Sequence, residues 1–224
     1  VRLHTGLPGI VAIPQAQAPL SIARDPVPES VTGFARPGQS LRALWPAGEE
    51  EARERLARFA DEQIHYYKEE RDLPAKPGTS QLSPYLAAGV ISPRQCLHAA
   101  LLSNNGEFES GSVGAATWIS ELIWREFYKH ILVGYPRVSR HRAFRPATEF
   151  LPWRDAPQEL AAWKEGRTGI PIIHAAIRQL LETGWMHNRL RMVVAMFLTK
   201  NLLIDWREGE RFFMQHLSDG DLAA

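Results

Sequence analysis

The stretch "GAATWISELIWREFYKHIL", residues 114–132, is the strongest indicator of fold class in this 224-residue chain. It holds no proline, and its apolar and polar residues separate onto two faces of an α-helix. Ile119, Leu122, Ile123 and Phe127 fall on the apolar side. The opposite sector, about 120° wide, carries an acid, a base and three aromatics, namely Trp118, Glu121, Trp124, Arg125 and Tyr128. The pattern predicts a long amphipathic helix.

Similar signals flank this helix on both sides. Helical spacing or helix start and stop residues mark residues 49–70, 82–88, 157–166, 171–184, 185–197 and 206–217, and Ser92-Pro93 is a favourable start for a further helix. Residues 135–157 form a proline-rich connector, and no strand-like alternation occurs. We therefore predict an all-α, multi-helix domain over residues 47–224. Residues 1–46, rich in Pro and Gly, are expected to be an irregular linker or extended segment.

Composition limits the possible functions. The net charge of +1 gives no global field that would attract an acidic partner, so any basic surface must be local. One cysteine excludes an intramolecular disulfide and fits a reducing compartment. No apolar run approaches the ~20 residues of a membrane span, and the N-terminus lacks the order of a signal peptide.

The polar face of residues 117–130 has two interpretations. Glu121 and Arg125 have the i, i+4 spacing of a solvated surface pair. The tryptophans on this face, Trp118 and Trp124, instead favour a surface that meets a flat ligand, because aromatic rings beside arginine suit a nucleobase or another π-system.

The stretch "WMHNRLRMVVAMF", residues 185–197, also combines opposite features. Arg189 and Arg191 fall in the first helical turn, where the helix dipole disfavours cations. This placement indicates an anion bound at the helix N-terminus, or alternatively arginines that pair with buried carboxylates.

Two shorter motifs are less specific indicators of a binding site. "GTSQLS", residues 78–83, resembles an anion cradle before a helix but is not a Walker A loop. "DGD", residues 219–221, would need further ligands to bind a metal; alternatively Gly220 is a left-handed turn residue between two solvated carboxylates. The histidines show no metal-ligand spacing, Cys96 is expected to be packed, and no metal site or hydrolase constellation is predicted.

Taken together, "GTSQLSPYLAAGVISPRQ", "WISELIWREFYKH", "GWMHNRLRMVVAMFL" and "DWREGERFFMQHLSDGDLAA" resemble the FAD-binding catalytic domain of the DNA photolyase and cryptochrome family over residues 40–224. Within it, the chain is most similar to bacterial class I cyclobutane pyrimidine dimer photolyases. The resemblance implies a deoxyribodipyrimidine photo-lyase, which splits pyrimidine dimers by light-driven electron transfer from reduced FAD to a flipped-out lesion. The alternatives are a cryptochrome-like photoreceptor and a flavin-free helical nucleic-acid-binding module. Met192 favours repair, because related (6-4) enzymes and many animal cryptochromes carry His there.

The resemblance also implies roles for particular residues. Cofactor contacts are implied for Tyr67, Thr79, Ser80, Gln81, Leu82, Ser83, Trp118, Asp219, Gly220 and Asp221. DNA contacts are implied for Arg71, Glu121, Trp124, Arg125, Tyr128, Asn188, Arg189, Leu190, Arg191 and Met192. Glu121 would stabilise the negative charge that a pyrimidine carbonyl gains after electron transfer, either as a protonated carboxyl or through a neighbouring residue. Trp153 and Trp206 match the outer and middle tryptophans of an electron relay to the flavin.

The same resemblance implies that parts of the family lie outside this sequence. The family continues beyond Ala224 into the residue near flavin N5 and the innermost relay tryptophan, so residues 1–224 alone are expected to be inactive. An α/β domain precedes residue 1 in the family and holds an antenna chromophore, folate or deazaflavin. His174 replaces the usual Asp and Ile177 the usual Met, which predicts that Arg189 or Arg191 lacks its carboxylate. The implied partner is UV-damaged DNA, bound by a cytoplasmic monomer that is nucleoid-associated on DNA.

Overall fold

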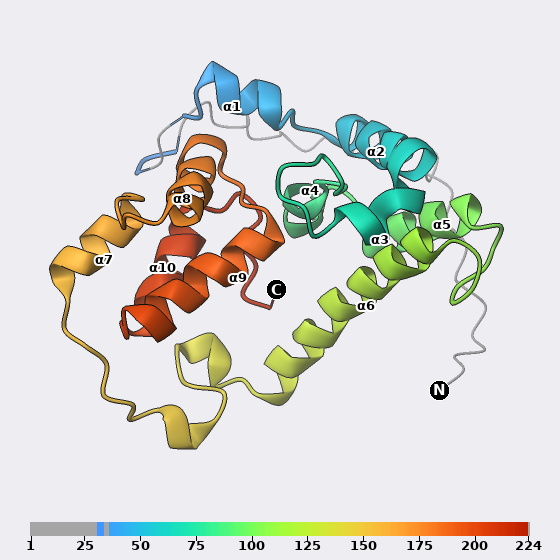
Figure 1. Cartoon of the computed structure of the whole chain (residues 1–224). Helices are drawn as coiled ribbons and strands as arrows, with labels where there is room; N and C mark the ends of the chain where they lie inside the picture. Colours follow the sequence, from blue (N-terminus) through green and yellow to red (C-terminus); the bar gives the residue numbers. More distant parts are fainter. Residues whose placement is uncertain (1–30, 34–35, 224) are drawn as a thin grey trace, which may run out of the picture.

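The computed structural model describes residues 31–33 and 36–223, and this part of the chain is helical without strands (Figure 1). The all-α prediction is confirmed. The helices are α1 (Gln39–Leu44), α2 (Glu49–Arg58), α3 (Tyr67–Glu70), α4 (Ser83–Ala87), α5 (Pro93–Ser103), α6 (Val113–Gly134), α7 (Pro157–Lys164), α8 (Pro171–Thr183), α9 (Asn188–Met196) and α10 (Trp206–His216).

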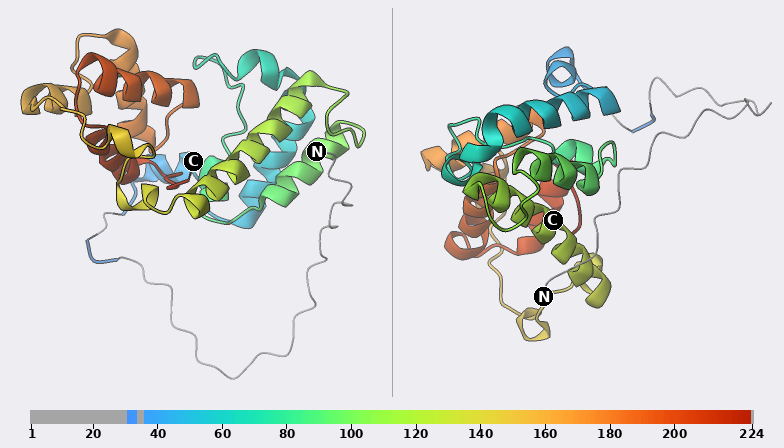
Figure 2. Two further views of the ribbon diagram at one scale, coloured as in Figure 1. Left: turned by 90° about the horizontal axis from the view of Figure 1, so that it is seen from below. Right: turned by 90° about the vertical axis from the view of Figure 1, so that its right-hand side faces the viewer.

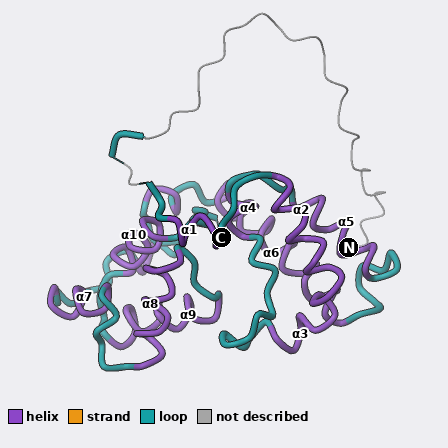
Figure 3. Tube along the Cα trace, turned by 90° about the horizontal axis from the view of Figure 1, so that it is seen from above, coloured by secondary structure: helices purple, strands orange, loops and turns teal. Residues whose placement is uncertain are grey.

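The helices form two lobes that lie side by side (Figures 2 and 3). The first lobe, α2 to α6, packs around a cluster that includes Phe59, Leu82 and Trp118. The second lobe, α7 to α10, packs around Trp163 and Ile177, among others. The C-terminal end of the chain lies between the lobes (Figures 1 and 3). Two separate cores leave room for a site where the lobes meet.

The long helix α6 confirms the prediction for residues 114–132. The Ser112 side chain accepts a hydrogen bond from the Ala115 amide and caps it. A Cβ at Gly114 would collide with the backbone oxygens of Ile64 and His65, so only glycine lets α6 approach this turn. Trp118 shares a face with Glu121 on the helical wheel, yet it is only 4% exposed and packs on Phe59, with ring centroids 4.9 Å apart.

Caps explain where several other helices begin and end. Ser92 and Gln95 form a reciprocal capping box at the start of α5. Gly184, at φ 67°, ends α8 in the left-handed conformation. The predicted helix over residues 49–70 is instead interrupted by a π-helical turn, Phe59–Gln63, and a 3-10 turn, Ile64–Tyr66.

The prediction of an irregular segment over residues 1–46 is wrong where α1 forms. Trp45, directly after α1, donates from Nε1 to the Thr183 carbonyl at 2.7 Å and attaches this segment to the second lobe. Residues 1–30 and 34–35 lie outside the described residues.

The proline-rich connector between α6 and α7 contains two 3-10 turns, Val138–Arg140 and Pro146–Thr148. Glu149 fixes it, accepting from the Ala143 amide at 2.9 Å and from the Arg207 guanidinium of α10 at 2.6 Å. The hydrogen bond from Ala143, opposed by partial desolvation and helped by the neighbouring arginines, lowers the pKa of Glu149. The connector is therefore tied to the second lobe through an ionised carboxylate.

Candidate functional site

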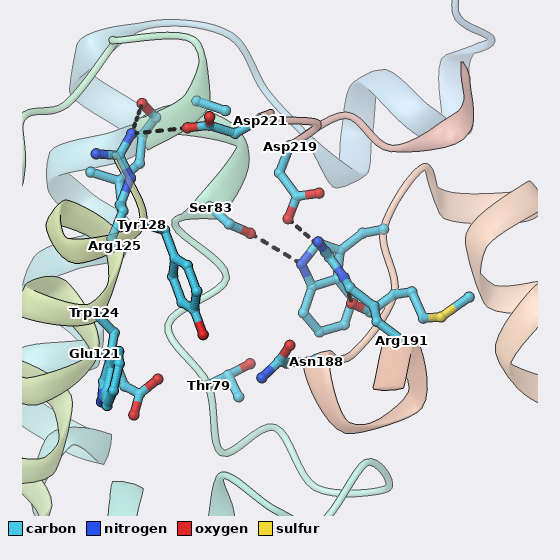
Figure 4. Close-up of a pocket in the computed structure, with 14 residues that line it drawn as sticks. Thr79, Ser83, Glu121, Trp124, Arg125, Tyr128, Asn188, Arg191, Asp219 and Asp221 are labelled. Carbon is cyan, nitrogen blue, oxygen red and sulfur yellow. Dashed lines mark hydrogen bonds and ion pairs between the residues drawn. The ribbon is translucent and has the colours of Figure 1, made fainter. Parts of the chain in front are cut away.

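A cavity of about 320 Å³ opens between the lobes (Figure 4), at the low end for small-molecule sites. Motifs far apart in sequence line it: the first lobe gives Thr79, Ser83, Leu86, Ala87, Glu121, Trp124, Arg125 and Tyr128, the second lobe Trp185, Met186, Asn188 and Arg191, and the C-terminal segment Asp219 and Asp221. We call this cavity the interlobe pocket. The four sequence motifs singled out for chemistry all contribute to its wall.

An ion pair joins α9 to the C-terminal segment in the pocket wall. The Arg191 guanidinium donates to Asp219 Oδ2 at 2.6 Å and to the Met186 carbonyl at 2.8 Å. The Asp219 side chain is 2% exposed, and its Oδ1 is buried without a hydrogen-bond partner among the described residues. The interpretation that arginine meets a buried carboxylate therefore holds for Arg191. The interpretation of "DGD" as a left-handed turn with two solvated acids is wrong, because Asp219 is buried and Gly220 has no positive φ.

Arg189 lies outside the pocket lining and pairs with Asp72, in the loop after α3, at 2.7 Å from Nε. This hydrogen bond lowers the pKa of Asp72, although the carboxyl is mostly exposed. The expectation that His174 leaves Arg189 or Arg191 unpaired is wrong, since both have carboxylate partners. His174 Nε2 instead accepts from the Gly169 amide at 2.9 Å.

On α6, Glu121 pairs with Arg71 and not with Arg125. Arg71 Nη1 lies 2.5 Å from Glu121 Oε1, whereas Arg125 donates to the Leu86 carbonyl at 3.2 Å and lies 3.7 Å from Asp221. The solvated i, i+4 pair is therefore absent. The Arg71 guanidinium also lies 5.5 Å from the centre of the Tyr67 ring. Glu121 thus reaches the pocket as an ion-paired carboxylate with a cation beside it.

Burial also shifts the pKa of Tyr67, whose ring lies next to Arg71. Desolvation raises the pKa of Tyr67 to about 12, because the neighbouring Arg71 only partly offsets the cost of a buried phenolate. A tyrosine hydroxyl is already protonated at neutral pH, and burial keeps that of Tyr67 protonated into the alkaline range, so it acts as a neutral donor or acceptor.

Aromatic side chains form the open part of the wall. Trp124 and Tyr128 are 49% and 46% exposed, and their ring centroids lie 6.0 Å apart. Half-exposed aromatics at a pocket mouth offer flat apolar surface to a stacking partner. Trp185 is a pocket residue that the predicted site omitted; its Nε1 donates to Ser83 Oγ at 3.3 Å. Its place in the same motif as Asn188 and Arg191 was the available signal.

The "GTSQLS" segment contributes only part of the predicted cradle. Thr79 and Ser83 line the pocket, whereas Ser80 and Gln81 do not and Leu82 is buried in the first lobe. A Cβ at Gly78 would collide with Glu70, so glycine lets this loop turn back against α3. The following helix, α4, has five residues, too few for the predicted helix N-terminus to be an anion site by itself.

The remaining predicted residues lie away from the pocket lining. Leu190 is buried and Met192 half-exposed. Trp153 is half-buried, and its Nε1 has no hydrogen-bond partner among the described residues. The Arg207 guanidinium lies over Trp206, 4.7 Å from the ring centroid. Trp118 and Tyr67 lie in the first core. The DNA contacts of Leu190 and Met192, the cofactor contacts of Tyr67 and Trp118, and the electron-relay roles of Trp153 and Trp206 stay predictions.

Among residues 31–33 and 36–223, no group of His, Cys, Asp or Glu side chains could hold a metal ion. In the same part of the chain, no helix is both long and apolar enough to cross a membrane.

Comparison with known proteins places these features in a family. Residues 118–224 match the FAD binding domain of DNA photolyase. The chain is 48% identical over all its 224 residues to the deoxyribodipyrimidine photo-lyase of Escherichia coli, covering 46% of that protein. It is 51% identical over 183 residues to the enzyme of the same name from Neurospora crassa, which is 81% of this chain and 30% of that one. The chain thus spans about half, or less, of the length of these relatives.

Solved structures agree with the sequence relatives. A class III photolyase from Agrobacterium tumefaciens has a TM-score of 0.76 at 42% identity, over 83% of this chain and 38% of that chain. A cryptochrome from Synechocystis has a TM-score of 0.70 at 31% identity, over 79% of this chain and 37% of that chain. The fold of this chain is therefore similar to that of solved photolyase and cryptochrome structures.

Proposed function

Because this chain belongs to the DNA photolyase and cryptochrome family through its FAD-binding domain, we propose that the whole protein is a deoxyribodipyrimidine photo-lyase. It binds FAD in the interlobe pocket and UV-damaged DNA over the pocket mouth, and it splits pyrimidine dimers in light. The observation that carries this proposal is the meeting of "GTSQLS", "WISELIWREFYKH", "NRLR" and "DGD" around one cavity.

The pocket residues fit a flavin nucleotide chemically. Thr79 and Ser83 supply hydroxyls, and Arg191 supplies a cation. Asp219 Oδ1, which has no hydrogen-bond partner in the part of the chain that the structure describes, is a buried acceptor that a ligand N–H or O–H donor would satisfy. A buried acceptor without a partner costs stability, which a bound ligand would recover. When bound, reduced FAD supplies the electron that light transfers to the lesion.

The residues of α6 suit the second partner. Trp124 and Tyr128 give a flipped-out pyrimidine a surface to stack against. Glu121 acts through its neighbour: Arg71, 2.5 Å away, is held as a cation beside the place where a carbonyl oxygen would gain negative charge. Arg71, Arg125 and Arg189 supply positive charge for the DNA backbone.

Absorption and repair measurements on the full-length protein test this proposal. We expect a flavin spectrum after purification, and loss of dimers from an oligonucleotide under blue light but not in the dark. A colourless protein that takes up no added FAD would support the flavin-free nucleic-acid-binding module. A flavoprotein that leaves dimers intact, even after chemical reduction, would support the cryptochrome-like photoreceptor, which the likeness to the Synechocystis structure favours.

We further propose the finer assignments within this function: a class I enzyme that acts as a monomer in the cytoplasm and associates with the nucleoid through DNA. The single cysteine supports a reducing compartment such as the cytoplasm. Size-exclusion chromatography with light scattering would test the monomer.

A further inference from the structure

The helix that carries Asn188 and Arg191 begins at an unusual cap. His187 precedes α9, and its ring Nδ1 accepts a hydrogen bond from the Arg189 amide at 3.2 Å. The backbone N–H of His187 donates to Gln179 Oε1 of α8 at 3.1 Å, which fixes the residue in place. Ser, Thr, Asp and Asn are the usual N-cap residues. Histidine differs from them because it can lose its acceptor by protonation between pH 5 and 8.

The geometry defines the proton position on the ring. Nδ1 must carry a lone pair to accept from the Arg189 amide, so the ring is neutral with its hydrogen on Nε2. A doubly protonated ring would turn an N–H toward the Arg189 N–H, donor against donor. The cap therefore exists only while His187 is uncharged.

The surroundings of His187 favour the neutral ring. The residue is 2% exposed, and burial lowers its pKa, helped by the cations Arg189 and Arg191. Asp72 and the Arg71 backbone act in the opposite direction, but Nε2 makes no hydrogen bond of acceptable geometry among the described residues. These groups come from α9 and from the loop after α3, while α8 presents the uncharged Gln179.

The turn that His187 caps connects three parts of the molecule. Asn188 lines the interlobe pocket, Arg189 reaches Asp72 of the first lobe, and Arg191 reaches the buried Asp219. A shift of this turn would therefore displace the pocket wall as well as the contact between the lobes.

We propose that His187 is a positioning residue of the interlobe pocket, whose neutral imidazole caps α9 and holds Asn188 and Arg191 in place, and whose protonation releases them. The effect on flavin binding rests on the function proposed above; the cap itself does not. Since burial depresses the pKa of His187, the cap stabilises the fold above about pH 6.5, the ordinary histidine value. The stability that the cap contributes is lost as the pH falls from about 6.5 through the lower pKa that His187 has in the folded protein.

Two measurements on the full-length protein separate these claims. The first is the hydrogen-exchange protection factor of the Arg189 amide at pH 7.5 and pH 5, which reads the cap directly. We expect it to drop about fivefold in the wild type, the factor that corresponds to a lost N-cap. The second is the fraction of FAD retained after gel filtration at the same pH values, which should fall in parallel.

The variants isolate the acceptor. His187→Asn keeps an N-cap acceptor that does not titrate, so its protection factor and retained FAD fraction should be the same at both pH values, whatever their level. His187→Phe keeps a ring without an acceptor and should show the low, acid-like protection at pH 7.5 as well. His174→Asn is the matched control, because His174 also accepts a backbone N–H but lies outside the pocket lining, and it should keep the wild-type pH dependence.

The outcomes distinguish this proposal from the proposed function. A fivefold change in Arg189 protection in a protein that never binds FAD would support the cap and refute the flavin site. Wild-type protection that stays constant from pH 7.5 to pH 5, or a His187→Asn variant that follows the wild type, would overturn the role of His187. Circular dichroism confirms that each variant is folded. If His187→Asn does not fold, His187→Ser, whose hydroxyl is an N-cap acceptor that does not titrate, replaces it with the same expectation.

Discussion

Replacing Arg191 with Ala should destabilise the protein more than any surface arginine change, because it leaves Asp219 buried without a partner. The Asp219 side chain is 2% exposed, its Oδ1 already lacks a partner, and its Oδ2 accepts only from Arg191 at 2.6 Å among the described residues. Breaking one side of a buried pair costs about 3–5 kcal/mol. Because Arg191 is 24% exposed and water can reach the vacated space, we expect the lower end, about 3 kcal/mol.

A loss of about 3 kcal/mol corresponds to roughly 100-fold in the unfolding equilibrium constant. Urea unfolding of the flavin-free protein, followed by far-UV circular dichroism, measures it. Arg178→Ala is the control: Arg178 is 79% exposed and pairs with Glu182 at i, i+4, so its loss should cost under about 0.5 kcal/mol.

The double variant Arg191→Ala, Asp219→Asn tests the cause. It removes the unpaired buried charge and should recover a substantial part of the lost stability. If Arg191→Ala unfolds at the same urea concentration as Arg178→Ala, the argument from the buried carboxylate is refuted.

Three further predictions concern relay, lesion chemistry and packing. Trp206→Phe should block photoreduction of the flavin while chemically reduced enzyme still repairs dimers, and an equal loss of both would indicate a packing role for Trp206. Glu121→Ala, which removes the partner of Arg71, should lower repair per absorbed photon more than DNA affinity, because charge stabilisation acts after binding; equal losses would make Glu121 a binding residue only. Gly114→Ala should cost about 1–3 kcal/mol, since the added Cβ meets the Ile64 and His65 carbonyls, whereas Gly134→Ala, with open space around it, should not.

Features that depend on neighbours within a few turns of helix could be predicted from the sequence alone. Helical periodicity predicted the all-α class, Ser92 and Gly184 marked the limits of two helices, and four motifs identified the segments that bear chemistry. These signals are local, because a cap or an amphipathic face is set by residues three or four positions apart. The family resemblance added a common site for those motifs, and the cavity between the lobes is lined by all four.

The pairing of charged side chains, in contrast, depends on contacts between segments far apart in the sequence. Arg191 meets Asp219 across 28 residues of sequence, Glu121 meets Arg71 across 50, and Arg189 meets Asp72 across 117. The sequence offered a nearer partner, Arg125 for Glu121 at i, i+4, as one of two interpretations, and the structure does not form that pair. Burial has the same origin: Trp118 and Trp124 share one helix face, yet Trp118 packs on Phe59 within the first core, whereas Trp124 is half-exposed and lines the pocket. Pairing and burial depend on how the lobes dock, and docking is a property of the whole packed chain.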